Sequence, residues 1–157
     1  MTDIKQLLTN EKIFFKEENI NGINCAIGYI KKFKWRWIAT QLNTFIIIGQ
    51  TEQLIDRSLI EEFSTSGYKY SIKNNRGWPR GIQSGVGSIA ILQGENIDYS
   101  AVEFCRKFPK KHWSVFEIPV LFDLNTKTTI KYSNKPLWGA MYFPFFTKTI
   151  DAITAKL

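Results

Sequence analysis

The residues best equipped for chemistry lie together in the middle of the chain. Residues 76–87 read RGWPRGIQSGVG, with four glycines and one proline, a composition that excludes a helix or a regular strand. A long ordered loop in a small domain is often functional, so we take this segment as the candidate ligand-binding loop. Two arginines beside free backbone N–H groups suit an anion. The candidate ligand-binding side chains of the loop are Arg76, Trp78, Arg80 and Gln83.

The glycines of the loop do not form a dinucleotide-binding fingerprint. In that fingerprint the glycines follow a strand and open a helix, whose N-terminus meets the phosphate. Here Gly85 and Gly87 precede a predicted buried strand over residues 88–93. The alternative that the loop is only structural therefore stays open, and it is the commoner case. The glycines would then serve only the geometry of a turn that precedes this strand.

Glu117 is the candidate that would complete a site from outside the loop. It shares one face of a predicted strand with Asp123, and the strand residues between them span roughly 20 Å. Two carboxylates that share an acid–base task lie within about 10 Å of each other, so these two do not form such a pair directly. Glu117 is expected to face solvent or to pair with a lysine. In the alternative, it joins the loop to form the site of a small enzyme for phosphoryl or glycosyl chemistry.

Histidine and cysteine are too few for the usual metal and nucleophile patterns. The chain has one histidine, His112, and two cysteines, Cys25 and Cys105. Structural zinc needs four such ligands at short spacing, and a two-metal nuclease of the Asp…Glu-x-Lys type needs a Glu-x-Lys step that this sequence does not contain. Cys105 falls on the apolar side of a predicted helix, as a buried structural thiol does. We expect no metal and no cofactor, although the acidic residues leave a carboxylate-only magnesium or manganese site open.

The chain is basic and rich in aromatic residues. Its net charge is +7 and its isoelectric point is near 9.4, which favours polyanionic partners without naming one. Aromatic residues make up 15% of the chain, more than one small core needs, so some rings are expected on a groove or at a partner surface. The expected partner is an anionic ligand or an acidic protein, and nucleic acid is the weaker alternative.

The clearest strand signal covers residues 30–40, where aromatic and basic residues alternate. A period of two is typical of a strand with one buried face and one face in water. A platform for single-stranded nucleic acid needs rings and cations on the same face, so this alternation favours an ordinary amphipathic strand. The predicted core face carries Phe33, Trp35 and Trp37, and the predicted wet face carries Lys32, Lys34 and Arg36.

The elements that would position these residues form an α+β fold. We predict a single domain, residues 1–157, with a mainly antiparallel or mixed sheet, two hairpins and about four helices packed on it. Pro119 predicts a sheet edge or a bulge in the strand of Glu117. The second helix is predicted to end at residues 64–67. The helices are predicted to begin near Thr2, Thr51, Asp98 and Pro144, and the strands to cover residues 30–40, 44–49, 68–72, 88–93, 112–124 and 128–132.

No catalytic set is complete in this sequence, so we expect a small non-enzymatic binding module for an anionic ligand or an acidic protein. One alternative is a small nuclease-like enzyme built on the loop and Glu117, and another is a nucleic-acid binder that uses the basic strand face.

The longest apolar run, residues 45–48, is far shorter than the roughly 20 residues of a membrane helix, and the start of the chain lacks a signal sequence. A cytoplasmic protein with no membrane partner is therefore expected.

Overall fold

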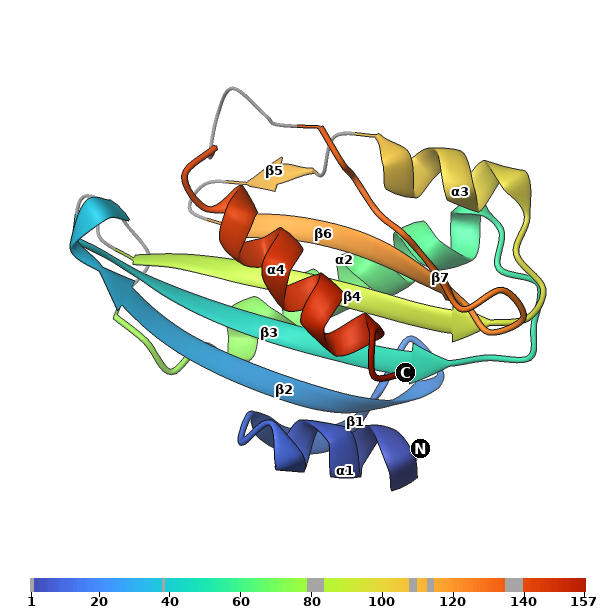
Figure 1. The fold of residues 1–157 in the computed structure, drawn as a ribbon, viewed down its shortest axis with the longest axis horizontal. Helices are drawn as coiled ribbons and strands as arrows, with labels where there is room; N and C mark the ends of the chain where they lie inside the picture. The colour runs from blue at the N-terminus through green and yellow to red at the C-terminus, as the bar shows by residue number, and fades with distance from the viewer. Residues whose placement is uncertain (1, 38, 79–83, 108–109, 113–114, 135–139) are drawn as a thin grey trace.

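The computed structural model describes residues 2–37, 39–78, 84–107, 110–112, 115–134 and 140–157, and every structural statement below concerns these residues (Figure 1). They form one seven-stranded sheet and four α-helices. The strands are β1 (Phe14–Ile20), β2 (Ile23–Lys34), β3 (Thr40–Gln50), β4 (Ser84–Gly94), β5 (Lys111–His112), β6 (Val115–Asp123) and β7 (Thr128–Ile130). The helices are α1 (Thr2–Asn10), α2 (Arg57–Asn74), α3 (Tyr99–Arg106) and α4 (Phe143–Thr154), and a short 3-10 helix, η1 (Trp35–Trp37), follows β2.

The sheet is mixed and open. Its strand order is β1-β2-β3-β4-β6-β5, and β7 also pairs with β6. The first three strands are antiparallel neighbours, whereas β3, β4 and β6 run parallel. Both β5 and β7 pair antiparallel with β6, at its opposite ends. The predicted α+β class with a mixed sheet and about four helices is confirmed.

Helices cover both faces of the sheet. The connections β3-α2-β4 and β4-α3-β6 advance in the same direction along the sheet, and the right-handed rule for such crossovers places both helices on one face. There α2 and α3 pack on a core that includes Phe45, Phe63 and Leu121. On the other face α1 and α4 pack on a core that includes Ile46 and Phe116 (Figure 1). Central strands β3 and β4 are therefore covered on both sides, which explains their nearly continuous apolar sequences.

The second helix is longer than the sequence predicts. Instead of ending at residues 64–67 and giving way to a strand over 68–72, α2 continues through both segments. Gly67, which suggested a break, is buried against the sheet, and a Cβ atom there would lie 3.0 Å from Ile47 Cδ1. Glycine in a helix costs about 1 kcal/mol relative to alanine, but here it allows the helix to approach β3 closely. The predicted end of this helix and the predicted strand 68–72 are therefore wrong.

The predicted starts of two helices and of one strand are confirmed. Helix α3 begins after Asp98, whose carboxylate accepts a hydrogen bond from a backbone N–H of the first turn at 2.9 Å. Pro144 lies in the first turn of α4, and Thr128–Ile130 returns along the end of β6 as the predicted hairpin. The exception is Thr51, because the N-cap of α2 is Asp56.

The predicted strand over residues 30–40 is broken in two. β2 ends at Lys34, η1 turns the chain, and β3 begins at Thr40 and pairs back along β2. A strand places successive side chains on opposite faces, but a helical turn does not. Rings and cations still alternate in the sequence after Lys34, but their side chains no longer lie on the two opposite faces of a strand there.

The end of the predicted loop is part of the sheet. β4 begins at Ser84, so residues 84–87 are strand and not loop. Glycine within a strand often marks a close approach by another group. At Gly87 that group is Phe146 of α4, whose Cε1 atom would lie 2.6 Å from an added Cβ atom. This glycine therefore serves the packing of α4 on the sheet.

Gly87→Ala should lower the free energy of unfolding by about 1–3 kcal/mol, the usual cost of an extra methyl group in a packed core. Urea unfolding measures this change. In the double variant Gly87→Ala/Phe146→Leu the smaller side chain makes room, so alanine should cost much less there than in the wild-type background. Equal costs in the two backgrounds would contradict a clash between residue 87 and the Phe146 ring.

Candidate functional site

The described part of the candidate loop is fixed to the start of β3. The backbone N–H of Trp78 donates to Gln41 Oε1 at 3.0 Å, and Ser84 Oγ donates to the carbonyl oxygen of Trp78 at 2.9 Å. Gly77 lies so close to Asn43 that a Cβ atom at residue 77 would overlap the Asn43 side chain. The backbone of Trp78 is thus held in place from both sides, while its ring is 48% exposed.

The predicted arginines of the loop are only partly described. Arg76 is exposed, and its guanidinium carbon lies 4.7 Å from the centroid of the Phe15 ring, a cation–π contact. Arg80 and Gln83 lie outside the described residues. The anion clamp expected from Arg76 and Arg80 stays a prediction.

The ring of Trp78 belongs to a surface cluster that we call the aromatic tip, made of Phe33, Trp35 and Trp78. The Phe33 centroid lies 5.4 Å from that of Trp35 and 6.3 Å from that of Trp78, with edge-on geometry. Phe33 is 41% exposed and Trp35 is 81% exposed. The prediction that both rings face the core is therefore wrong, although Trp37, the third ring of that pattern, is buried and donates from Nε1 to the carbonyl oxygen of Met141 at 3.0 Å.

The exposure of the tip follows from the lengths of the strands. β1 pairs with β2 only as far as Gly28, so residues 30–34 of β2 have β3 as their one strand partner. Beyond that point Phe33 extends past the region covered by β1. Trp35 sits in η1, where the chain reverses, and projects from the end of the hairpin. Trp35 is therefore exposed, and not in the core as predicted, because it lies in η1 and not in a continuous strand.

A basic groove adjoins the tip on the opposite face of the hairpin, toward α4. Lys32 and Lys34 lie on this face, with Lys32 Nζ 5.2 Å from the Phe145 ring centroid and Lys34 Nζ 4.8 Å from the Trp37 ring centroid. Lys148 of α4 lines the other side. The groove has a volume of about 560 Å³, and its walls include Lys32, Lys34, Trp37, Met141, Phe145 and Lys148.

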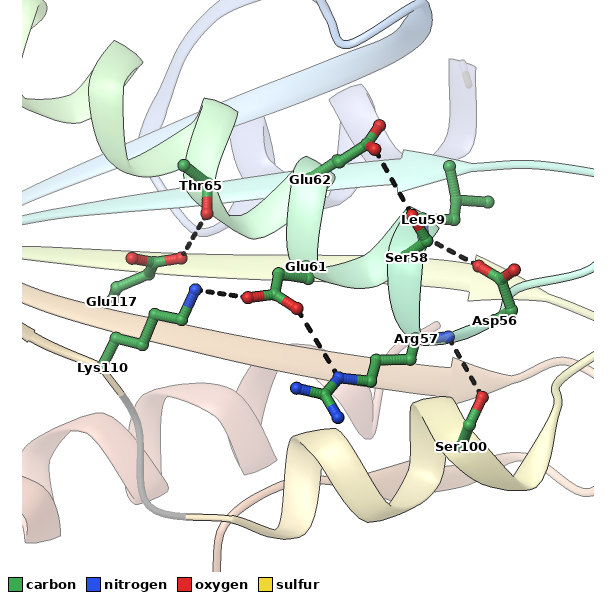
Figure 2. Close-up of polar contacts among 10 residues, drawn as sticks. All are labelled: Asp56, Arg57, Ser58, Leu59, Glu61, Glu62, Thr65, Ser100, Lys110 and Glu117. Carbon is green, nitrogen blue, oxygen red and sulfur yellow. Dashed lines mark hydrogen bonds and ion pairs between the residues drawn. The ribbon is translucent and has the colours of Figure 1, made fainter.

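Glu117 lies in a second polar cluster, between β6 and α2. Its side chain is 2% exposed. The hydroxyls of Ser64 and Thr65 donate to Glu117 Oε1 at 3.0 and 3.1 Å, and His112 Nε2 lies 2.8 Å from Oε2 (Figure 2 shows the Thr65 contact). Tyr68 stacks on the His112 ring with centroids 4.0 Å apart. We call these five residues the Glu117 cluster.

Burial corrects the expectation that Glu117 faces solvent or pairs with a lysine. A buried carboxylate costs several kcal/mol unless hydrogen bonds compensate, and here two hydroxyls and an imidazole do so. Asp123, by contrast, ends β6 at a turn, and its side chain accepts from the Asn125 N–H at 2.8 Å. Pro119 lies between the stretches of β6 that pair with β5 and β7, so the predicted sheet edge is confirmed there.

A small pocket opens beside the Glu117 cluster. It has a volume of about 160 Å³, and Lys107, Phe104 and Pro119 are among its lining residues. Glu61 lies on its wall between two cations, 2.6 Å from Lys110 Nζ and 3.6 Å from Arg57 Nε (Figure 2). The hydrogen bond and ion pair from Lys110, with a smaller contribution from Arg57, hold the pKa of Glu61 below its usual value.

A buried carboxylate that orients a half-exposed imidazole can support acid–base chemistry. The hydroxyls of Ser64 and Thr65 donate to Glu117 and not to His112, so the imidazole does not activate either of them as a nucleophile. The cysteines offer none either: Cys25 and Cys105 are free and buried, and burial raises the pKa of each thiol to about 12.

The aromatic tip and the Glu117 cluster are built from different helices and strands. Arg76 and Trp78 contact side chains of β1, β2 and β3, whereas the side chain of Glu117 is bonded by α2 and His112. The predicted enzyme site joins Arg76, Arg80 and Gln83 of the loop to Glu117. Arg76 lies against Phe15 of β1, and Arg80 and Gln83 lie outside the described residues, so this site stays a prediction.

Several residues of both sites are missing from the sequence-based candidates. Gln41 and Asn43 are buried polar residues at the start of an apolar strand, and His112 lies five positions before Glu117, so a local signal existed for each. Ser64 and Thr65 are more than 50 positions from Glu117 in the sequence, so no local sequence pattern predicts their hydrogen bonds to it.

Within the described ranges, no three His, Cys, Asp or Glu side chains are grouped as metal ligands. No helix in the same part of the chain is long and apolar enough to cross a membrane. Comparison of the chain with protein families, with curated proteins and with solved structures finds no match.

Proposed function

We propose that this protein is a non-enzymatic binding module that recognises an anionic partner through the aromatic tip and the lysines beside it. The observation that carries the proposal is the 81% exposure of Trp35 next to two further exposed rings. Large rings in water forgo the hydrophobic stabilisation that burial would give, roughly 2–3 kcal/mol per side chain. Clusters of exposed aromatic residues are typical of binding surfaces, where tryptophan often dominates the binding energy.

Charge supports an anionic partner. Lys31 and Lys32 are exposed on the hairpin that carries the tip, and the chain as a whole has a net charge of +7. A basic surface attracts acidic partners at long range, whereas the rings supply contact area at short range. The proposal includes both an acidic protein segment and a smaller anionic ligand.

The lysines are tested with two polyanions, heparin and poly-glutamate. Lys31→Gln/Lys32→Gln should weaken binding to at least one polyanion by about ten-fold, measured by titration at low salt, since each tenfold corresponds to about 1.4 kcal/mol. The matched control is Lys69→Gln/Lys73→Gln on α2, which removes the same two charges from the exposed surface of another element. Equal losses in both variants would show that only net charge matters.

The rings are tested separately. Trp35→Ala and Trp78→Ala should each weaken polyanion binding while the melting temperature stays nearly unchanged, because Trp35 is 81% exposed, Trp78 is about half exposed, and the Trp78 backbone contacts remain. Tyr99→Ala is the control, since Tyr99 is 69% exposed on α3. A large drop in melting temperature in the tryptophan variants would instead show that the aromatic tip stabilises the fold.

A second candidate function is an enzyme that uses Glu117 and His112 for acid–base catalysis. The contact of the buried Glu117 with the partly exposed His112 favours it, and cations around the adjacent pocket, such as Lys107 and Lys110, suit a phosphate-bearing substrate. Hydrolysis of p-nitrophenyl phosphate, bis-p-nitrophenyl phosphate and p-nitrophenyl glycosides tests this candidate. Turnover that disappears in His112→Gln would support it, and an inactive wild-type protein would count against it.

A further inference from the structure

We infer that the anionic partner is single-stranded nucleic acid, held at the end of the β2–β3 hairpin with bases on the aromatic tip and phosphates on the lysines of the basic groove. This inference rests on the proposed function and narrows the partner to one chemistry. Proteins that bind single strands combine exposed rings, on which successive bases stack, with a cationic groove that follows the backbone. Both components are present here on one hairpin.

The geometry places rings and lysines on either side of one free edge. Among the described strands, none pairs with the outer side of β2 beyond Tyr29. The side chain of Phe33 points to the α2 face, and those of Lys32 and Lys34 point to the α4 face. Trp35 lies at the apex, where the chain reverses, with its ring against Phe33. Phe33 and the lysines therefore lie on opposite faces, unlike the rings and cations of a flat strand platform, and a flexible single strand contacts both faces by bending around the apex.

The rings discriminate between nucleic-acid forms. A duplex keeps its bases stacked inside and offers no base face to Trp35, whereas an unpaired base can stack on an exposed ring. The lysines alone do not carry this conclusion, because lysines on a free strand edge also prevent edge-to-edge pairing between molecules. That protective role gives no reason for an 81% exposed tryptophan.

Binding is measured by fluorescence anisotropy with labelled oligo(dT) of about 20 nucleotides, longer than one ring cluster covers, and with a hairpin duplex of the same nucleotide count. The wild-type protein should prefer the single strand. Three phosphate contacts, from Lys32, Lys34 and Lys148, predict a slope of about −2 in a plot of log K against log salt.

Two variants separate stacking from charge. Trp35→Ala should weaken oligo(dT) binding by roughly 10- to 100-fold with an unchanged salt slope, as expected for one lost base–ring stack. Lys148→Gln should make the slope less steep by about 0.7, the share of one phosphate on a single strand. Tyr99→Ala and Lys69→Gln are the matched controls and should bind like the wild type.

The outcomes distinguish this inference from the proposed function. Binding of heparin or poly-glutamate through the tip, without binding of oligo(dT), would overturn the inference and leave the proposed function standing. Absence of binding to all three at low salt would overturn both. Equal affinity for duplex and single strand would overturn the inference, as would Trp35-dependent binding to anionic lipid vesicles in place of oligo(dT).

Discussion

Glu117→Ala should lower the free energy of unfolding by about 3–5 kcal/mol. The change removes the acceptor for Ser64, whose hydroxyl is fully buried, and a buried hydroxyl without a partner costs about 1–3 kcal/mol. It also leaves a cavity between α2 and β6, because the surrounding core relaxes only partly. Urea unfolding at constant pH measures the difference.

Conservative variants at the same position separate volume from hydrogen bonding. Glu117→Gln keeps the size and one carbonyl oxygen, so it should cost only about 1 kcal/mol, one net hydrogen bond. The double variant Ser64→Ala/Glu117→Leu replaces the fully buried pair by apolar groups, and such exchanges are often neutral or stabilising. Thr65 and His112 also lose their acceptor, but both are only partly buried and can bond to water.

The double variant decides what Glu117 is for. Stability equal to or above that of the wild type would mean that the buried carboxylate is not required for the fold, and a residue that costs stability is commonly retained for function. This result would strengthen the enzyme candidate. A loss as large as that of Glu117→Ala would assign the Glu117 cluster to structure and leave the aromatic tip as the functional site.

Where local chemistry decides the structure, the sequence was a sufficient guide. Asp98 caps α3, and Pro144 starts α4, because each residue satisfies or tolerates the free backbone groups at a helix start. The long helix α2 was not predictable in the same way, because Gly67 reads locally as a break. Glycine is needed at position 67 because the helix packs closely against Ile47 of β3, and this contact exists only in the folded sheet.

The candidate sites show the same division. Trp78 was predicted from the composition of its loop, and its exposure agrees with a binding role. Trp35 was assigned to the core, since a period of two is the usual mark of a half-buried strand, yet η1 interrupts the strand at that residue. Glu117 was expected near solvent although it stands alone in the otherwise apolar sequence of β6, and its partners on α2 are distant in sequence.

Phe146→Ala should be as costly as the loss of Glu117, about 3–5 kcal/mol in the free energy of unfolding. The Phe146 side chain is 1% exposed, and its ring lies 5.2 Å from Phe116 and 5.8 Å from Phe145 between ring centroids. Gly87 on β4 leaves space for it. Phe146 is therefore one of the main contacts of α4 with the sheet, beside the buried Phe143, Ile150 and Ile153.

The same change should reach the basic groove, because α4 supplies one of its walls through Phe145 and Lys148. Oligo(dT) affinity measured well below the unfolding midpoint should fall in Phe146→Ala, whereas Ile60→Val, a smaller core change under α2, should leave it unaltered. A stable α4 with unchanged affinity would show that the groove does not contact the ligand, and binding would then be confined to the rings of the tip. A loss of affinity in both variants would instead reflect general loosening of the core.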